Sequence, residues 1–291
     1  MFKSGYIAVI GRPNVGKSTL INAFLGEKLM AVSAKPQTTR QQVLGIKNVP
    51  GAQMLFLDTP GIHRPHKALN RAMVQAAHDA QEEADLFLFV VEPDQKWAKE
   101  DVEIYRRIAE RNKPILVVIN KADTVYKPNL LPVMAELIEK YPAVGVVPIS
   151  ALKKQNLDHL EEEIVKLLPE GPAFFDDDRL SDKTERFFTS EVIREKVMEL
   201  TKKEVPYAVA VLIEEFEERP KNLYIRAAII VDKDSQKGIL IGAKGQMIKK
   251  IGELARKELE VRLAKPLFLE LFIRVETDWT QYPNKVSEFQ P

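Results

Sequence analysis

The sequence has no cysteine, almost no net charge and no long hydrophobic segment. Without cysteine the chain forms no disulfide, thiolate nucleophile, iron–sulfur cluster or cysteine-ligated zinc site. Its 43 Lys and Arg residues nearly balance 42 Asp and Glu residues, for a formal charge of +1, so any polyanion site must depend on local charge. Apolar runs such as residues 86–91 are far shorter than the ~18 residues of a membrane span, and the N-terminal residues lack the pattern of a signal peptide. We therefore expect a cytoplasmic protein.

The 291 residues are enough for about two domains of ~150 residues. In the first part of the chain, short apolar runs typical of buried strands alternate with helix-length stretches. The expected strands are 7–10, 54–57, 86–91, 115–119 and 144–149, and the expected helices are 18–25, 99–111, 130–140 and 157–168. This alternation predicts an α/β domain with a mostly parallel sheet covered by helices on both faces.

The pattern changes near residue 169, where Pro and Gly end the last helix and an irregular acidic segment follows, with Phe174 and Phe175 as its expected anchors. The segments expected beyond it are a helix at 190–203, strands at 208–215 and 223–231, helices at 235–241 and 246–263, and a strand at 267–276. This order predicts a smaller α+β domain. We place the first domain at 1–170, an interdomain linker at 171–187, the second domain at 188–280 and a C-terminal tail at 281–291.

The first expected strand runs directly into GRPNVGKS at residues 11–18, the pattern GxxxxGK[ST], and then into a helix. Glycines let backbone N–H groups turn inward around a polyphosphate, and the helix N-terminus adds positive potential. We expect Lys17 to reach the β- and γ-phosphates and to neutralise charge in the transition state. We expect the Ser18 hydroxyl to ligate Mg²⁺. The pattern predicts a P-loop NTPase domain.

Two further motifs follow expected strands of the same sheet. In DTPG, Asp58 is placed to hold the metal and its water shell, and the Gly61 N–H to contact a γ-phosphate. In NKAD, the Asp123 carboxylate can accept both N1–H and N2–H of guanine, a donor pair that adenine does not offer. Ser150 and Ala151 close the next strand, where the Ala151 N–H could meet guanine O6. Together the motifs favour GTP and GDP over adenine nucleotides.

In this order the motifs resemble the guanine-nucleotide-binding domain of translation-factor-related GTPases, over residues 1 to about 168. By that resemblance the GTP-binding residues are Gly11, Arg12, Pro13, Asn14, Val15, Gly16, Lys17, Ser18, Thr19, Asp58, Thr59, Pro60, Gly61, Ile62, Asn120, Lys121, Ala122, Asp123, Ser150 and Ala151. PQTTR at 36–40 is similar to the switch I motif of a subgroup that includes the tRNA-modification GTPase. The resemblance implies Thr39, or alternatively Thr38, as a Mg²⁺ ligand and makes Thr39 part of the catalytic set with Lys17 and Gly61.

One position departs from the Ras pattern. Ile62 stands where Ras-like enzymes carry the glutamine that orients the attacking water, and an aliphatic side chain cannot do this. Arg12 and Arg40 are candidate arginine fingers by location only. We therefore expect slow intrinsic hydrolysis. Asn14 matches the P-loop asparagine that helps bind K⁺ in some relatives, so K⁺ stimulation is a hypothesis.

The second domain carries GAKG at residues 242–245, between two expected helices. Such a GxxG turn lets a nucleic-acid backbone approach closely, and the element order resembles that of a type II KH domain. Residues 237–265 contain eight basic residues against three acidic ones, so positive charge is concentrated around this turn. We expect RNA binding by Ile241, Gly242, Ala243, Lys244, Gly245, Lys249 and Lys250.

A type II KH domain after a GTPase domain with these motifs resembles the Era-type family of bacterial GTPases, over about residues 3–280. The resemblance implies a monomeric GTPase switch that binds the 3′ end of 16S rRNA, assists assembly of the 30S ribosomal subunit and associates peripherally with the cell membrane.

Two other interpretations stay open. A signalling GTPase could bind a protein or a membrane surface through its second domain. A small-molecule kinase would also use the P-loop, although DTPG and NKAD disfavour it.

His63 and His66 could suggest a metal pair, but no third ligand at suitable spacing accompanies them, so we interpret them as switch II residues.

Overall fold

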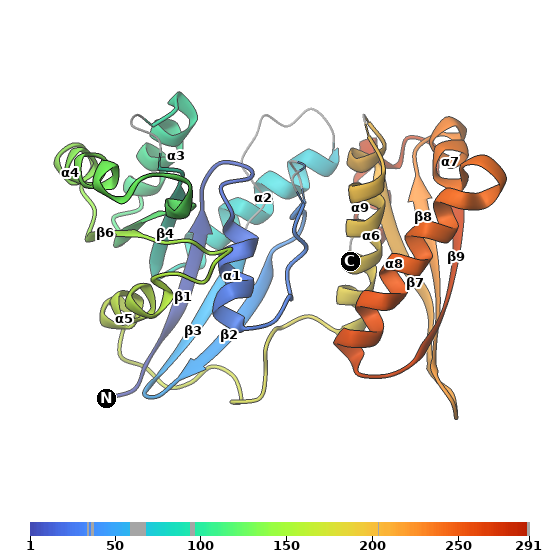
Figure 1. The fold of residues 1–291 in the computed structure, drawn as a ribbon, viewed down its shortest axis with the longest axis horizontal. Coiled ribbons are helices and arrows are strands. Elements are labelled where there is room, and N and C mark those ends of the chain that lie inside the picture. Colours follow the sequence, from blue (N-terminus) through green and yellow to red (C-terminus); the bar gives the residue numbers. More distant parts are fainter. Residues whose placement is uncertain (34, 36–37, 59–67, 94–96, 203, 290–291) are drawn as a thin grey trace. The chain divides into compact units, whose positions relative to one another are not determined.

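A computed structural model describes residues 1–33, 35, 38–58, 68–93, 97–202 and 204–289 of the chain (Figure 1). The chain divides into two compact units, and each unit contains one sheet. The first unit comprises residues 1–63 and 73–182, and the second comprises residues 183–291 together with residues 64–72, which include the first turn of a helix whose remainder belongs to the first unit. No helix within the described ranges is long and apolar enough to cross a membrane.

The first unit is built on a six-stranded sheet in the order β2-β3-β1-β4-β5-β6. The strands are β1 (Lys3–Ile10), β2 (Val43–Val49), β3 (Ala52–Asp58), β4 (Leu86–Val91), β5 (Ile115–Ile119) and β6 (Gly145–Pro148). All neighbouring strands are parallel except β2 and β3, which are antiparallel. Since parallel strands end at the same edge of a sheet, the segments that follow β1, β3, β5 and β6 meet there.

Helices cover both faces of this sheet. They are α1 (Lys17–Leu25), α2 (Ala68–Glu83), α3 (Lys99–Ala109), α4 (Leu130–Lys140) and α5 (Leu157–Leu167). In α3 the buried residues Ile104, Tyr105 and Ile108 recur at helical spacing and pack with Phe87 and Phe89 of β4. On the opposite face, the ring of Phe24 in α1 stacks on Phe56 of β3 at 5.1 Å.

Residues 172–182, which we term the strap, follow α5 and run along the edge strand β2. The Ser181 hydroxyl donates to Leu44 O at 2.6 Å, and Leu180 O accepts the Ile46 N–H at 2.9 Å. The buried Gln53 amide of β3 accepts the N–H of Phe174 at 2.7 Å. The strap thus pairs with a sheet edge that would otherwise present unpaired backbone groups.

The second unit contains a three-stranded sheet in the order β7-β8-β9, in which β8 is antiparallel to β7 and parallel to β9. Its elements are α6 (Glu185–Leu200), β7 (Val209–Glu218), β8 (Leu223–Val231), α7 (Asp234–Ile241), α8 (Gln246–Leu263), β9 (Leu267–Val275) and α9 (Pro283–Phe289). Alternate residues of β8, such as Ile225 and Ile229, share one core with Ile193 of α6 and with Ile251 and Leu259 of α8.

The C-terminal residues form part of this unit. Trp279 is fully buried and its indole N–H donates to Ala208 O at 3.1 Å. The Thr280 hydroxyl donates to the buried Asp232 carboxylate at 2.9 Å. The Phe289 ring of α9 meets Trp279 edge-on at 5.9 Å. The residues that the sequence suggested as a tail therefore include a short helix packed against the unit.

The predicted fold class is confirmed: a mostly parallel α/β sheet precedes a smaller α+β domain with the order α-β-β-α-α-β. Two elements of the first unit were not predicted. Strand β2 lies at the sheet edge, so its residues Lys47 and Asn48 stay partly exposed and interrupt the apolar pattern. Helix α2 has few bulky apolar residues, because small residues such as Ala77 and Ala80 make its buried contacts.

Candidate guanine-nucleotide and nucleic-acid sites

The P-loop wraps around the N-terminus of α1. Gly11 and Gly16 have φ values of 158° and 101°, and a Cβ on Gly16 would lie 2.3 Å from Asn120 Nδ2. Only glycine fits at residue 16, because that φ is rare for other residues and the space is filled. Since α1 begins at Lys17, its first backbone N–H groups have no partner within the helix and point toward the loop. The loop is thus shaped for phosphate oxygens.

Lys17 lies inside this loop. Its ammonium donates to Gly11 O at 2.9 Å and to Arg12 O at 3.0 Å. Burial lowers the pKa of Lys17 to about 8, although the nearby Asp58 carboxylate opposes the shift. Phosphate oxygens would favour the charged ammonium and raise that pKa again.

Three oxygen atoms converge beside Lys17. Asp58 Oδ2 lies 2.9 Å from Ser18 Oγ and 3.0 Å from Thr39 Oγ1, and the two hydroxyl oxygens are 3.3 Å apart. Adjacent ligands of an octahedral Mg²⁺ ion, each about 2.1 Å from the metal, lie about 3.0 Å apart. The donor set therefore fits Mg²⁺ and leaves its remaining positions to water and phosphate oxygens. Thr38, the alternative ligand, instead donates to Lys35 O at 2.7 Å.

Several predicted site residues lie outside the described residues. They are Thr59, Pro60, Gly61 and Ile62 of the proposed nucleotide site, and the switch II residues His63 and His66.

The base end of the site is formed by the residues after β5 and β6. The Ser150 hydroxyl and the Lys153 ammonium, 3.1 Å from the carboxylate, hold the pKa of Asp123 below its usual range. The carboxylate is consequently ionised at neutral pH, and it can accept two N–H groups of one base. Lys121 has a positive φ of 61°, and its ammonium donates to Asn14 O at 2.8 Å.

Asn120 connects the three loops. Its side-chain N–H donates to Val15 O of the P-loop at 2.8 Å, and its Oδ1 accepts the Ala151 N–H at 3.0 Å. The Ala122 N–H donates to Ile149 O at 2.9 Å. In this structure the Ala151 N–H is thus engaged by Asn120, and a guanine O6 would share that donor or replace Asn120 as its acceptor.

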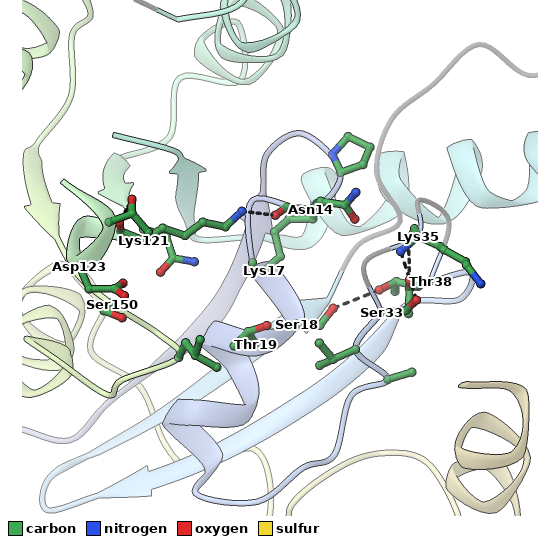
Figure 2. Close-up of a pocket in the computed structure, with 18 residues that line it drawn as sticks. Asn14, Lys17, Ser18, Thr19, Ser33, Lys35, Thr38, Lys121, Asp123 and Ser150 are labelled. Carbon is green, nitrogen blue, oxygen red and sulfur yellow. Dashed lines mark hydrogen bonds between the residues drawn. The ribbon is translucent and has the colours of Figure 1, made fainter. Parts of the chain in front are cut away.

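A cavity of about 680 Å³ joins the phosphate and base ends (Figure 2). The figure shows Lys121, Asp123 and Ser150 at one end, Ser18 and Thr38 at the other, and Asn14 and Lys17 between them. Predicted residues that line it are Pro13, Asn14, Gly16, Lys17, Ser18, Thr19, Asn120, Lys121, Asp123 and Ser150, with Thr39. Lining residues that the sequence did not indicate are Ala31, Val32, Ser33, Lys35, Thr124 and Leu152. Leu152 could have been predicted as a lining residue, because it directly follows the Ser150–Ala151 pair.

The two candidate arginine fingers, Arg12 and Arg40, have different surroundings in this structure. The Arg12 side chain donates to Asp101 of α3 at 2.7 Å. Arg40 is buried, with 4% of its surface exposed.

In the second unit, the GAKG turn separates α7 from α8. Gly242 has φ 67° and ψ 179°, and a Cβ there would lie 2.8 Å from Met247 Cβ. Lys244 and Gly245 also have positive φ values, and the Lys244 side chain is exposed. The turn therefore presents backbone and one cation at the positive end of α8, an arrangement that suits a phosphodiester.

A groove of about 400 Å³ runs between α8 and β9. Ile248, Leu269 and Leu271 supply apolar lining, and Phe268, a residue that is 55% exposed, lies beside them. Lys249 and Arg256 add positive charge, which exceeds the one negative charge of Glu253 in the same lining. Unpaired bases can stack on apolar and aromatic surfaces while cations hold the backbone, so the groove suits single-stranded nucleic acid.

The structure places Lys249 in this groove, whereas Lys250 is exposed on α8 and does not line it. Ile241, Gly242, Ala243, Lys244 and Gly245 form the turn and its approach. Arg256, Phe268, Leu269 and Leu271 were not predicted as site residues. Their role depends on β9 lying beside α8, which local sequence patterns do not reveal.

The fold and these two sites define a guanine-nucleotide-binding P-loop protein with a KH domain. Residues 6–121 match the family model described as 50S ribosome-binding GTPase, and residues 204–280 match the KH domain model.

Curated relatives match nearly the whole chain. GTPase Era of Geotalea daltonii is 49% identical over 99% of this chain and 97% of its own. GTPase Era of Aquifex aeolicus is 47% identical over 99% of this chain and 98% of its own. A crystal structure of Era in complex with MgGDPNP and nucleotides 1506–1542 of 16S ribosomal RNA has a TM-score of 0.96 at 46% identity and covers 100% of this chain and 99% of its own. An Aquifex aeolicus Era variant bound to GDP·AlF4⁻ has a TM-score of 0.95 at 46% identity and covers 99% of each chain. The chain belongs to the Era family of GTPases.

Asp123→Asn should change the base preference of the nucleotide site from guanine to xanthine. An amide cannot accept both N–H groups of guanine, but its NH₂ can donate to the 2-oxo group of xanthine. We expect the affinity for GDP to fall about 100-fold or more, since two hydrogen bonds to a charged group are lost, and the affinity for XDP to rise. Nucleotide titration calorimetry measures both, with Asp158→Asn on α5 as the matched control. Unchanged preference for GDP would contradict the assignment of Asp123.

Lys244→Glu should weaken RNA binding. The exposed side chain stands at the turn where a backbone phosphate would lie, so charge reversal replaces attraction by repulsion. We expect about tenfold weaker binding of single-stranded RNA and a shallower salt dependence, measured by fluorescence anisotropy at several salt concentrations. Lys166→Glu on α5 makes the same change of total charge and should have little effect. Equal losses in both variants would argue against a site at the turn.

Proposed function

We propose that this protein is a GTP-hydrolysing switch that binds the 3′ end of 16S rRNA and assists maturation of the 30S ribosomal subunit. One observation carries the proposal: a cavity shaped for a guanine nucleotide and a KH groove occur in one chain that aligns over almost its full length with proteins named GTPase Era. The relative crystallised with a GTP analogue and a 16S rRNA fragment supports both ligands.

In this proposal each end of the cavity has one role. Asp123 selects guanine, and the P-loop N–H groups with Lys17 bind the phosphates and neutralise charge as water attacks the γ-phosphate. Ser18, Thr39 and Asp58 would hold Mg²⁺, which supplies charge neutralisation between the β- and γ-phosphates when bound. Because Thr39 lies on switch I, loss of the γ-phosphate would release that segment.

Hydrolysis is proposed to be slow without an added factor. Ile62 cannot orient water, and the structure has Arg12 held by Asp101 and Arg40 buried. Gly61 is retained in the proposed catalytic set through its backbone N–H. K⁺ could contribute positive charge near Asn14, whose side chain borders the cavity. Equal hydrolysis rates in KCl and NaCl would exclude that contribution.

The strap offers a route from nucleotide to RNA. β2 begins four residues after Thr39, and Leu44 accepts the Ser181 hydroxyl and donates its N–H to Asp182 at 3.2 Å. Thr184 lies two residues after Asp182, and its hydroxyl caps the N-terminus of α6. A displacement of switch I would therefore be transmitted through β2 to the start of the KH domain, which supports nucleotide-dependent access to the GxxG groove.

We further propose that the protein acts in the cytoplasm as a monomer. Membrane association remains an expectation from the family resemblance, and binding to a protein or lipid partner becomes one outcome of the test below.

The decisive test is binding of a short single-stranded RNA copy of the 16S rRNA 3′ end with GTP analogue, GDP or no nucleotide. A scrambled RNA and an ATP analogue are the controls. We expect sequence-selective binding that is tighter with the GTP analogue, and a smaller difference between nucleotides in Ser181→Ala. That variant loses one buried hydrogen bond, about 1 kcal/mol, while leaving both sites intact.

GTP binding without RNA preference would retain the GTPase and overturn its role on rRNA, and binding to anionic vesicles would then test the membrane alternative. Equal RNA affinity with GDP and GTP analogue would instead contradict only the coupling.

A further inference from the structure

Glu92 follows β4 directly, between the P-loop on one side and the residues after β5 on the other. It belongs to none of the GRPNVGKS, PQTTR, DTPG and NKAD motifs, and it does not line the nucleotide cavity. Its side chain is partly buried, with 29% of its surface exposed.

Two cations from different parts of the nucleotide site face this carboxylate. The Lys121 ammonium forms an ion pair and hydrogen bond with Glu92 Oε1. The Arg12 guanidinium of the P-loop lies 3.9 Å from Glu92 Oε2. Asp101 is the other nearby acid, and it accepts the Arg12 Nε–H at 2.7 Å and the Ala98 N–H at 3.1 Å. Arg12 thus has its shorter contact with Asp101, whereas the closest cationic partner of Glu92 is Lys121.

The position of Lys121 matters because its side chain crosses the cavity from the base end to the P-loop. Its ammonium reaches Asn14 O at 2.8 Å, a bond drawn in Figure 2. The stem of a lysine can cover an apolar or aromatic surface while its charge is held elsewhere. A side chain of this length loses much rotamer freedom when fixed, so a charged acceptor that holds the ammonium reduces the cost of ordering it on nucleotide binding.

We propose that Glu92 is a positioning residue for nucleotide binding, which orders Lys121 across the cavity and thereby joins the base-recognition loop to the P-loop. Glu92 touches neither base nor phosphate. Its action passes chiefly through Lys121, and the inference rests on the GTP-binding part of the proposed function.

A second electrostatic effect of Glu92 would act in the opposite direction, so the sign of the change in nucleotide affinity tests the proposal. Removing one negative charge near the site would, by the loss of long-range repulsion alone, tighten the binding of an anionic nucleotide. That repulsion acts through solvent and is screened by salt, whereas the loss of a charge-assisted hydrogen bond is local. We therefore expect the local loss to prevail, and the two explanations predict opposite signs.

The experiment measures GDP dissociation and GTP hydrolysis in the full chain with Glu92→Gln. We expect GDP to dissociate about fivefold to tenfold faster and KM for GTP to rise by a similar factor, while kcat changes less than about twofold. Glu92→Asp, which keeps the charge, should restore most of the effect. Glu163→Gln, which removes the exposed ion pair with Lys166 on α5, is the matched control.

A double-mutant cycle with Lys121→Met tests the route. Once Lys121 lacks its ammonium, Glu92→Gln should have no further effect on the dissociation rate. Tighter GDP binding, additive effects of the two changes, or failure of Glu92→Asp to restore binding would each overturn the inference. If the unaltered protein binds no guanine nucleotide, the proposed function itself fails. This failure is distinguishable from a failure of the Glu92 inference, because it is seen without any variant.

Discussion

The buried side chain of Asn120 is the contact on which the nucleotide site depends. Its amide has a donor and an acceptor in fixed geometry, so it can satisfy Val15 O and the Ala151 N–H simultaneously. These groups belong to loops after β1 and β6, which lie far apart in the sequence. Burial makes an unsatisfied partner costly, and the loops are therefore held together without any ligand. The base recognition that we propose for Asp123 and the phosphate binding that we propose for Lys17 both require this alignment.

Much of this site could be predicted from the sequence, because each motif follows a parallel strand and all such strands end at one edge of the sheet. Strands 86–91 and 115–119 and helix 246–263 were predicted with the bounds observed. What could not be predicted depends on contacts between segments distant in sequence. Two examples are the hydrogen bond from Arg12 to Asp101 and that from the Ala151 N–H to Asn120. From the sequence, Arg12 and the Ala151 N–H were equally able to contact the nucleotide directly. Sequence patterns record which groups a loop carries, whereas their partners depend on the packing of neighbouring loops.

The second unit shows the same division between local and distant information. The turn at 242–245 was recognisable because Gly242 has a positive φ that other residues rarely adopt, and because a side chain there would clash with Met247. The groove beside it was not, because its lining combines Ile248 and Arg256 of α8 with Phe268 and Leu271 of β9. The basic residues counted in the sequence also separate in space. Lys249 lies in the groove, whereas Lys265 pairs with Glu218 and Arg262 lies over the ring of Phe188. Net charge in a segment thus overstates the charge available to one ligand.

Edge strand β2 gives a reason for the position of the strap. An exposed edge needs a partner, and the chain supplies one from residues 172–182 rather than from another strand. The same pairing fixes the last residues of the first unit on the strand that follows switch I. A segment that was only a flexible tether could not transmit a displacement of a few ångströms, because its own freedom would absorb the change. Backbone and side-chain hydrogen bonds at Leu44 and Ile46 remove that freedom up to Asp182. Protection of a sheet edge and the coupling that we propose between nucleotide and RNA binding therefore place the same physical demand on these residues.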